Sequence, residues 1–281
     1  DDDFGLQLQE TVYALDATII DLCLSVFPWA RFRKTKGAIK LHTLLDLKGN
    51  IPSFIAITAA KVHEVNILHQ LIPGAGAIYI MDRGYFDFQR LYIFHQFSSF
   101  FVVRAKASAS LQRLYSMPVD KSCGLRCDQI VLPAAFYARK NYPEKLRRVV
   151  FVDEDKDIRL NLMTNQMTLP ALTIAELYRC RWQVELFFKW IKQHLRIKAF
   201  YGTSENAVKT QIWISISMIV YLIIAIMKER FRLEIQLSQL LHFLEVNLFE
   251  RKPLVSIFQL NDRKTETGKE TGYIQLKLFD Y

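Results

Sequence analysis

Three acidic residues stand where an unpaired carboxylate would be costly. Asp16 interrupts the apolar run of residues 11–22, Asp82 follows the apolar segment 77–81, and Glu185 lies among apolar residues of a helical pattern. Buried carboxylates need cations or metal ions as partners. Mg²⁺ prefers oxygen ligands, and two such ions about 4 Å apart stabilise both the entering and the leaving oxygen of a phosphoryl displacement. Each acid alone is explained equally well as a paired structural carboxylate, but all three converging would make a site for hard divalent cations.

A stripe of polar side chains surrounds the last of these acids. On a helix with about 100° between residues, a sector of about 60° holds Tyr178, Arg181, Glu185 and Lys192. Apolar positions lie directly beside this sector, so the helix would pack on a core and present the stripe at its edge. The stripe would combine one metal-binding carboxylate with cations and a hydroxyl for phosphate oxygens. Trp182 is near enough to stack on a base, with ordinary helix packing as the equal alternative.

The net charge is concentrated in two windows. The 281 residues include 37 Lys and Arg against 28 Asp and Glu, which gives a net charge of +9. Residues 31–40 carry five cations and no acid, and residues 178–198 carry six cations and one acid. Either run alone is more simply a solvated face, but two local basic patches are what a polyanion would contact. A hydrophobic share of 51% with only 10 Gly and 8 Pro excludes disordered and collagen-like classes.

Apolar runs separated by turn residues predict an α/β core in the first part of the chain. Strands are expected over residues 11–22, 38–47, 51–59, 77–81 and 99–105, and helices over 64–72 and 87–97. The turn Lys48-Gly49-Asn50 joins the second strand to the third. The first three strands should therefore form an antiparallel meander.

The pattern then changes from β to α. Residues 106–170 show short alternating runs without helical periodicity, which predicts a β-rich stretch. Asp153, Asp155 and Asp157 lack the later Gly and Glu of a calcium loop and are expected to mark a hairpin turn. Further helices are expected over residues 173–195, opened by a capping box of Thr173 and Glu176, over 205–232 and over 235–249, with a loosely held tail after Pro253.

One apolar run resembles a membrane segment. Residues Ile212 to Met227 are almost unbroken in apolar character. As a helix they would cover about 24 Å, which is short of the roughly 30 Å hydrocarbon core of a bilayer. We therefore expect a helix buried on most sides, and no membrane partner, with a membrane span as the less favoured alternative.

These residues together resemble a known family. Tyr178-x2-Arg181-x3-Glu185-x6-Lys192 is similar to the signature of bacterial transposases of the insertion-sequence-four type, which are DDE recombinases. Leu15-Asp16-Ala17-Thr18 resembles the first acidic motif of that family, and Asp82-Arg83-Gly84-Tyr85 resembles the second. The order of the acids, two on strands and one on a helix, is also the order of the family. The resemblance covers about residues 12–230.

The resemblance implies a fold and its parts. The fold would be α/β and ribonuclease-H-like, with a mixed five-stranded sheet, flanking helices and a β-rich insertion before the catalytic helix. The expected parts are residues 1–105 as the first part of the core, 106–170 as the insertion, 171–252 as the catalytic and C-terminal helices, and 253–281 as a flexible tail. Only 15 residues precede Asp16, so we expect a fragment that lacks the N-terminal DNA-recognition region of the family.

The resemblance also implies an activity, namely DNA cleavage at the ends of an insertion sequence and strand transfer to target DNA. Asp16, Asp82 and Glu185 would be catalytic and would bind two Mg²⁺ ions, with Mn²⁺ as a substitute. The DNA-binding residues would be Tyr178, Arg181, Trp182, Lys189, Lys192, Arg33, Lys34 and Lys36. The partners would be double-stranded DNA, as terminal inverted repeats and as target, and a second copy of the chain, in the bacterial cytoplasm at the nucleoid.

Two other hypotheses stay open at this point. A structure-selective nuclease on the same core would share the three acids and cleave without joining, and a strand-transfer assay separates it from a transposase. A non-catalytic DNA-binding or membrane-associated protein would use the basic windows or the apolar run. Carboxylates more than about 10 Å apart would favour this last hypothesis, because ions about 4 Å apart must share their ligands.

Overall fold

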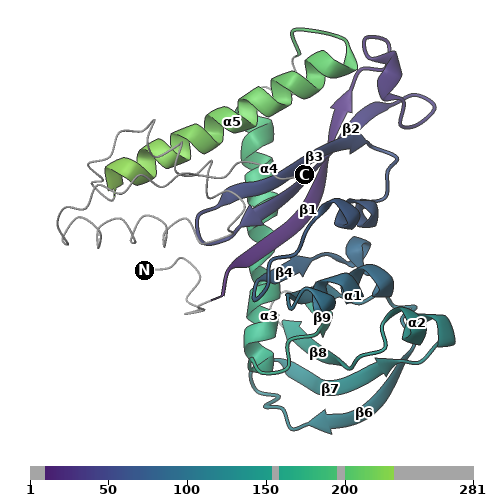
Figure 1. Cartoon of the computed structure of the whole chain (residues 1–281). Coiled ribbons are helices and arrows are strands. Elements are labelled where there is room, and N and C mark those ends of the chain that lie inside the picture. Colours follow the sequence, from purple (N-terminus) through teal and green to yellow (C-terminus); the bar gives the residue numbers. More distant parts are fainter. Residues whose placement is uncertain (1–9, 154–157, 195–199, 231–281) are drawn as a thin grey trace, which may run out of the picture.

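A single mixed sheet organises the chain in the computed structural model, which describes residues 10–153, 158–194 and 200–230. The sheet has nine strands in the order β3-β2-β1-β4-β5-β9-β8-β7-β6. Their bounds are β1 Val12–Leu22, β2 Gly37–Asp46, β3 Ile51–Ala59, β4 Ile78–Met81, β5 Phe100–Arg104, β6 Leu111–Met117, β7 Leu125–Pro133, β8 Leu146–Asp153 and β9 Ile158–Thr164. Figure 1 shows this sheet running through the molecule with helices on both of its faces.

The five strands expected in the first 105 residues are confirmed and are neighbours in the sheet. β1, β2 and β3 form the antiparallel meander, and β4 and β5 follow as strands parallel to β1. The β-rich stretch after β5 continues the same sheet, because β9 pairs with β5 and adds β8, β7 and β6 behind it. The five-stranded sheet is thus extended to nine strands, which covers the edge that β5 would otherwise expose.

The helices divide between the two faces of the sheet. The 3-10 helix η2 (Glu64–Gln70) and helix α1 (Phe88–Gln96) cover one face, where every second strand residue, such as Tyr13 and Leu15, is buried. Helices α3 (Ala171–Cys180), α4 (Trp182–His194) and α5 (Glu205–Arg230) cover the other face. The remaining short helices are η1 (Pro28–Ala30), η3 (Arg83–Tyr85) and α2 (Phe136–Asn141), of which α2 was not expected from the sequence.

The helix expected over residues 173–195 is in fact two helices, and its expected cap is wrong. α3 begins at Ala171, directly after Pro170, and no side chain caps it, so Thr173 lies inside the helix. Arg181 separates α3 from α4 in a tighter turn, in which its N–H donates to the carbonyl of Tyr178 at 3.1 Å and its carbonyl accepts from Val184 at 3.1 Å. The two helices therefore follow one another end to end (Figure 1).

Helix α5 contains the apolar run and is less buried than expected. Its described side chains alternate between a buried stripe of Val208, Ile212 and Ile216 and an exposed side on which Trp213 and Ile214 keep 44% and 59% of their surface. The expectation of burial on most sides is thus wrong for residues 212–217, where α5 packs on β3 through this stripe, and the burial of residues 218–227 lies outside what the structure describes. None of the described helices has the length and apolar character needed to cross a bilayer.

Two other expectations have a mixed outcome. Asp153 of β8 pairs with Ile158 of β9, so the expected hairpin is confirmed, although residues 154–157 themselves lie outside the described residues. The helix expected over residues 235–249 and the tail after Pro253 also lie outside the described residues.

Candidate active site

The register of two parallel strands places the first two acids side by side. In the pairing of β1 with β4, Leu15 is opposite Met81. Asp16 and Asp82 are the next residues of the two chains, so both follow the last pair of this ladder. Asp16 points to the face covered by α3 and α4, because its neighbours Ala14 and Ile20, with the same parity, are buried in that core.

Arg181 joins the third acid to the first. Its Nη1 donates to Asp16 Oδ2 at 2.5 Å, and its Nη2 donates to Glu185 Oε1 at 2.5 Å. A planar guanidinium holds both carboxylates in this way because its donors form a rigid fork. The carboxylates of a strand and a helix that are 169 positions apart are therefore gathered around one side-chain group.

Tyr178 brings the second acid into the same cluster. Its hydroxyl donates to Asp82 Oδ1 at 3.3 Å, and the Arg181 Cζ lies 5.8 Å from the centre of its ring. Tyr178 and Arg181, expected from the sequence to grip phosphates, thus contact the acids themselves. The structure brings together Asp16, Asp82, Tyr178, Arg181 and Glu185, all of which were expected at the site.

Burial dominates the electrostatics of this cluster. It raises the pKa of Asp16 to about 6, with Glu185 and Asp82 adding to the effect and Arg181 and the Ala17 N–H, 2.8 Å away, opposing it. It also raises the pKa of Tyr178 to about 12, which keeps this phenol protonated as a hydrogen-bond donor. Burial disfavours the charge of Arg181, but the surrounding carboxylates outweigh it and its pKa is raised.

Tyr85 is a member of the site that the sequence did not single out for a role. Its side chain is fully buried, and its hydroxyl has no hydrogen-bond partner among the described residues. Burial, followed by the charges of Asp16, Glu64 and Asp82, raises the pKa of this phenol well above its ordinary value. The signal available in the sequence was its place three residues after Asp82.

The donor set of the site fits a hard divalent cation. Three carboxylates supply only oxygen ligands, which is the preference of Mg²⁺ and Mn²⁺. Burial is the main cause of the raised pKa of Asp16, and Arg181 offsets it only in part, so a bound cation would further stabilise the charged carboxylate. Within the described part of the chain no three acidic, histidine or cysteine side chains are already arranged to hold a metal ion. A metal would therefore have to displace the Arg181 guanidinium from Asp16 and Glu185.

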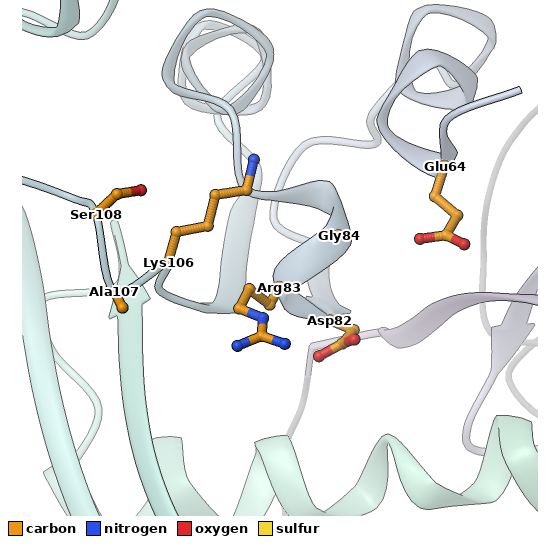
Figure 2. A pocket seen from close by; sticks show the side chains of 7 residues that line it. All are labelled: Glu64, Asp82, Arg83, Gly84, Lys106, Ala107 and Ser108. Carbon is orange, nitrogen blue, oxygen red and sulfur yellow. The ribbon is translucent and has the colours of Figure 1, made fainter.

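Two pockets flank the acids. The first, of about 570 Å³, is lined by Asp16, Ala17, Thr18, Glu185, Phe188, Lys189, Lys192 and Gln193. The second, of about 590 Å³, is lined by Glu64, Asp82, Arg83, Gly84, Lys106, Ala107 and Ser108. Figure 2 shows Asp82 and Arg83 side by side in the middle of the second pocket, with Glu64 on one side and Lys106 and Ser108 on the other.

The residues expected to bind DNA fall into two groups. Lys189 and Lys192 line the first pocket beside Glu185, and Trp182, 58% exposed, stands at the start of α4. Three other cations, Arg33, Lys34 and Lys36, are exposed in the turn that leads into β2 and line neither pocket. Lys106 and Ser108 line the second pocket but were not expected from the sequence. The available signal was their position just after β5, because β4 and β5 are parallel and their carboxyl ends meet at one edge of the sheet.

Comparisons with known proteins identify relatives over most of the chain. The chain is 32% identical to a protein described as a transposase from Sinorhizobium fredii over 232 residues, which is 82% of this chain and 64% of that protein. It is 30% identical over 220 residues to a transposase of an insertion sequence element from Geobacillus stearothermophilus, and 26% identical over 224 residues to one from Synechocystis. These matches cover 74% and 77% of this chain, and 55% and 60% of those proteins. The chain thus spans 55–64% of the length of these relatives.

The fold is also found in a solved structure. The piggyBac transposase synaptic complex with hairpin DNA matches with a TM-score of 0.51 at 10% sequence identity, over 92% of this chain and 54% of that chain. This likeness confirms the α/β, ribonuclease-H-like fold class. The family model described as "Transposase DDE domain" matches residues 7–223. The chain therefore belongs to the DDE transposase domain family of bacterial insertion sequences.

Proposed function

We propose that the chain is the catalytic core of an insertion-sequence transposase, which cleaves DNA at the ends of its element and joins the freed 3′ hydroxyl to target DNA. The observation that carries this proposal is the gathering of Asp16, Asp82 and Glu185 around Arg181 and Tyr178. Family membership and the insertion-sequence relatives support the same reaction class.

The three acids would hold two Mg²⁺ ions, or Mn²⁺ in their place. Such ions supply Lewis acidity at a phosphate oxygen and charge stabilisation for both oxygens of the displacement. For this to happen Asp16 must be ionised, which its pKa of about 6 permits at neutral pH. Arg181 would then leave the carboxylates, and its fork of donors suits a phosphate as well as it suits a carboxylate. Tyr178 would remain the protonated donor between Asp82 and the substrate.

The DNA would lie across the acids along the basic side of α4. Lys189 and Lys192 stand in the pocket that Asp16 and Glu185 line, so they suit the backbone on either side of the reacting phosphate. Trp182 offers an exposed ring for an unstacked base. The substrates would be terminal inverted repeats and target DNA, bound by a homodimer on paired ends at the bacterial nucleoid. The similarity of residues 178–192 to the insertion-sequence-four signature supports this assignment.

The test is the loss of Mg²⁺-dependent cleavage in Glu185→Gln of the full-length protein, on a duplex that carries the end of the element. Glu176→Gln is the matched control, because Glu176 is an acid of the adjoining helix α3 that lines neither pocket. Cleavage by Glu185→Gln at the rate of the control would contradict the proposal. Integration products in a strand-transfer assay of the wild-type protein would exclude a nuclease that only cleaves.

A further inference from the structure

The second pocket holds two cations that the described contacts do not use. Arg83 and Lys106 are both exposed on its wall, and neither forms an ion pair with any described residue. Ser108 adds a hydroxyl to the same wall. Exposed cations and a hydroxyl around a concave surface are the groups that bind phosphate oxygens.

The acids of this pocket leave part of this positive charge uncompensated. Glu64 accepts from Lys40 Nζ at 3.2 Å, and the same ammonium donates to the carbonyl of Val62 at 2.9 Å, so the charge of Glu64 already has its partner. Asp82 accepts from Tyr178 and belongs to the cluster of catalytic acids. Because the partner of Asp82 is a neutral hydroxyl, its one negative charge stands against the two positive charges of Arg83 and Lys106, and the pocket wall keeps a net positive charge.

The sheet fixes where these cations stand. β4 and β5 are parallel, so the segments that follow them leave the sheet at the same edge. Arg83 follows β4 in the short helix η3. Lys106 follows β5 in a turn, in which the Lys106 carbonyl accepts from Ala109 N at 3.0 Å. The backbone that carries both cations is thus held by hydrogen bonds, and it lies directly beside Asp82.

We propose that the second pocket binds a backbone phosphate of the DNA substrate, on the side of the acids opposite to Lys189 and Lys192. Arg83 would offer its fork of donors, Lys106 a mobile point charge and Ser108 a hydroxyl. The two pockets then grip one strand on both sides of the reacting phosphate, which holds that phosphate over Asp16 and Asp82. This inference rests on the proposed function, because it assumes that DNA crosses the acids.

The test measures DNA binding apart from cleavage. A fluorescent duplex of arbitrary sequence is titrated with the Glu185→Gln chain in EDTA at several salt concentrations. Each phosphate contact contributes about 0.9 to the slope of log affinity against log salt. Lys106→Gln should make that slope shallower by about 0.9, so the factor by which the variant binds more weakly than its parent should shrink about 3.5-fold when the salt concentration is raised fourfold. Lys106→Arg should keep the slope, and Ser108→Ala should weaken binding without changing it.

Lys121→Gln is the matched control, because Lys121 is an exposed lysine of the same insertion and lines neither pocket. It should bind as the parent does. Lys106 is exposed, so its variant should keep the thermal unfolding midpoint of the parent. If Lys106→Gln has the slope of the parent, the pocket does not bind phosphate, and this result stands even where the wild-type protein cleaves DNA as proposed. If the wild-type protein fails to cleave while the slope of Lys106→Gln falls, the proposed function fails and the phosphate site remains.

Discussion

Arg181 is the residue on which the geometry of the acids depends. Its guanidinium is mostly buried and bridges Asp16 and Glu185, so it occupies the position of a cation between two carboxylates. The acids themselves were predictable, because a carboxylate inside an apolar run needs a partner. The bridge was not, since a helical wheel shows which residues of a helix share a face but not which strand they meet.

We expect Arg181→Ala to lower the free energy of unfolding in EDTA by about 3 kcal/mol, because the variant leaves buried carboxylates without their cation. Mg²⁺ should then stabilise the variant more than the wild type, in which the metal must first displace the guanidinium. Urea unfolding with and without Mg²⁺ measures both effects. Arg179→Ala, an exposed arginine two positions earlier, is the control and should change little. Equal stabilities of the two variants would show that the bridge contributes nothing.

We expect the buried His42 to lower the free energy of unfolding as the pH falls. Burial, with the charge of Lys40 as the second cause, lowers its pKa from 6.5 to about 4. Between these values the unfolded chain binds a proton that the folded chain does not, so the free energy of unfolding falls as the pH falls, by up to about 3 kcal/mol. Asp16, whose pKa is raised from 3.8 to about 6, acts in the opposite direction over most of this window and by a similar amount, so the contribution of His42 shows only as a difference between two proteins.

Comparing the wild type with His42→Gln isolates the contribution of the histidine to stability, because Asp16 is present in both proteins. His42→Gln keeps a polar partner for Thr58, whose Oγ1 lies 3.0 Å from the imidazole Nε2. Urea unfolding at both ends of the window should show that the wild type loses stability relative to His42→Gln as the pH falls. The same change of stability with pH in both proteins would mean that His42 does not titrate there.

At the scale of elements, apolar patterns were reliable where they were local. The strands β1 to β5 were predicted within one or two residues, because each is an apolar run with turn residues at its ends. The interruption at Arg181 was missed, since the helical period continues through it and only the contacts of Arg181 with β1 and α4 give it a reason. The burial of residues 212–217 in α5 was overestimated, because an apolar run does not reveal how many of its sides have a neighbour.

The turn at Gly124 leads into β7, and we expect the stability of the added strands to depend on it. It has φ +88°, and a Cβ there would lie 2.6 Å from the carbonyl oxygen of Val152. Its own carbonyl accepts from Val152 N at 2.8 Å, which joins the start of β7 to β8. Gly124→Ala should therefore lower the free energy of unfolding by about 3 kcal/mol, as the sum of left-handed strain and a displaced strand.

The control for this prediction is another glycine with positive φ. Gly76 has φ +76° and nothing within 4 Å of an added Cβ, so Gly76→Ala should show the strain alone, about 1 kcal/mol. Urea unfolding of the two variants measures the difference. Equal losses would indicate that the backbone of β8 moves aside at no cost.

At the scale of the whole molecule, the pairing of β9 with β5 decides the architecture. The sequence predicted a β-rich insertion but not its place, because about 60 residues separate Val102 from its partner Thr164 and no local pattern encodes such a pairing. As a result the insertion continues the sheet that carries Asp16 and Asp82, and Lys106, at its start, lines the same pocket as Asp82. The basic turn before β2 lies far from this edge, and the sequence alone could not tell whether its charge joins the site.

The length of bound DNA should reveal the role of that turn. Leu22 pairs with Gly37 at the start of β2, six residues along β1 from Asp16, so the turn is about 20 Å from the acids at about 3.3 Å per residue. A duplex advances about 3.4 Å per base pair, so it must extend about six base pairs beyond the reacting phosphate to reach Arg33, Lys34 and Lys36.

Replacing all three by Gln should lower the salt slope of binding by up to about 3 with a longer duplex. With a duplex that ends short of the turn, the triple variant and its parent should have the same slope, both measured in the Glu185→Gln chain with EDTA. A slope that is unchanged at every length would remove the turn from the DNA path, and a slope that falls equally at every length would place it at the acids, against the geometry of β1.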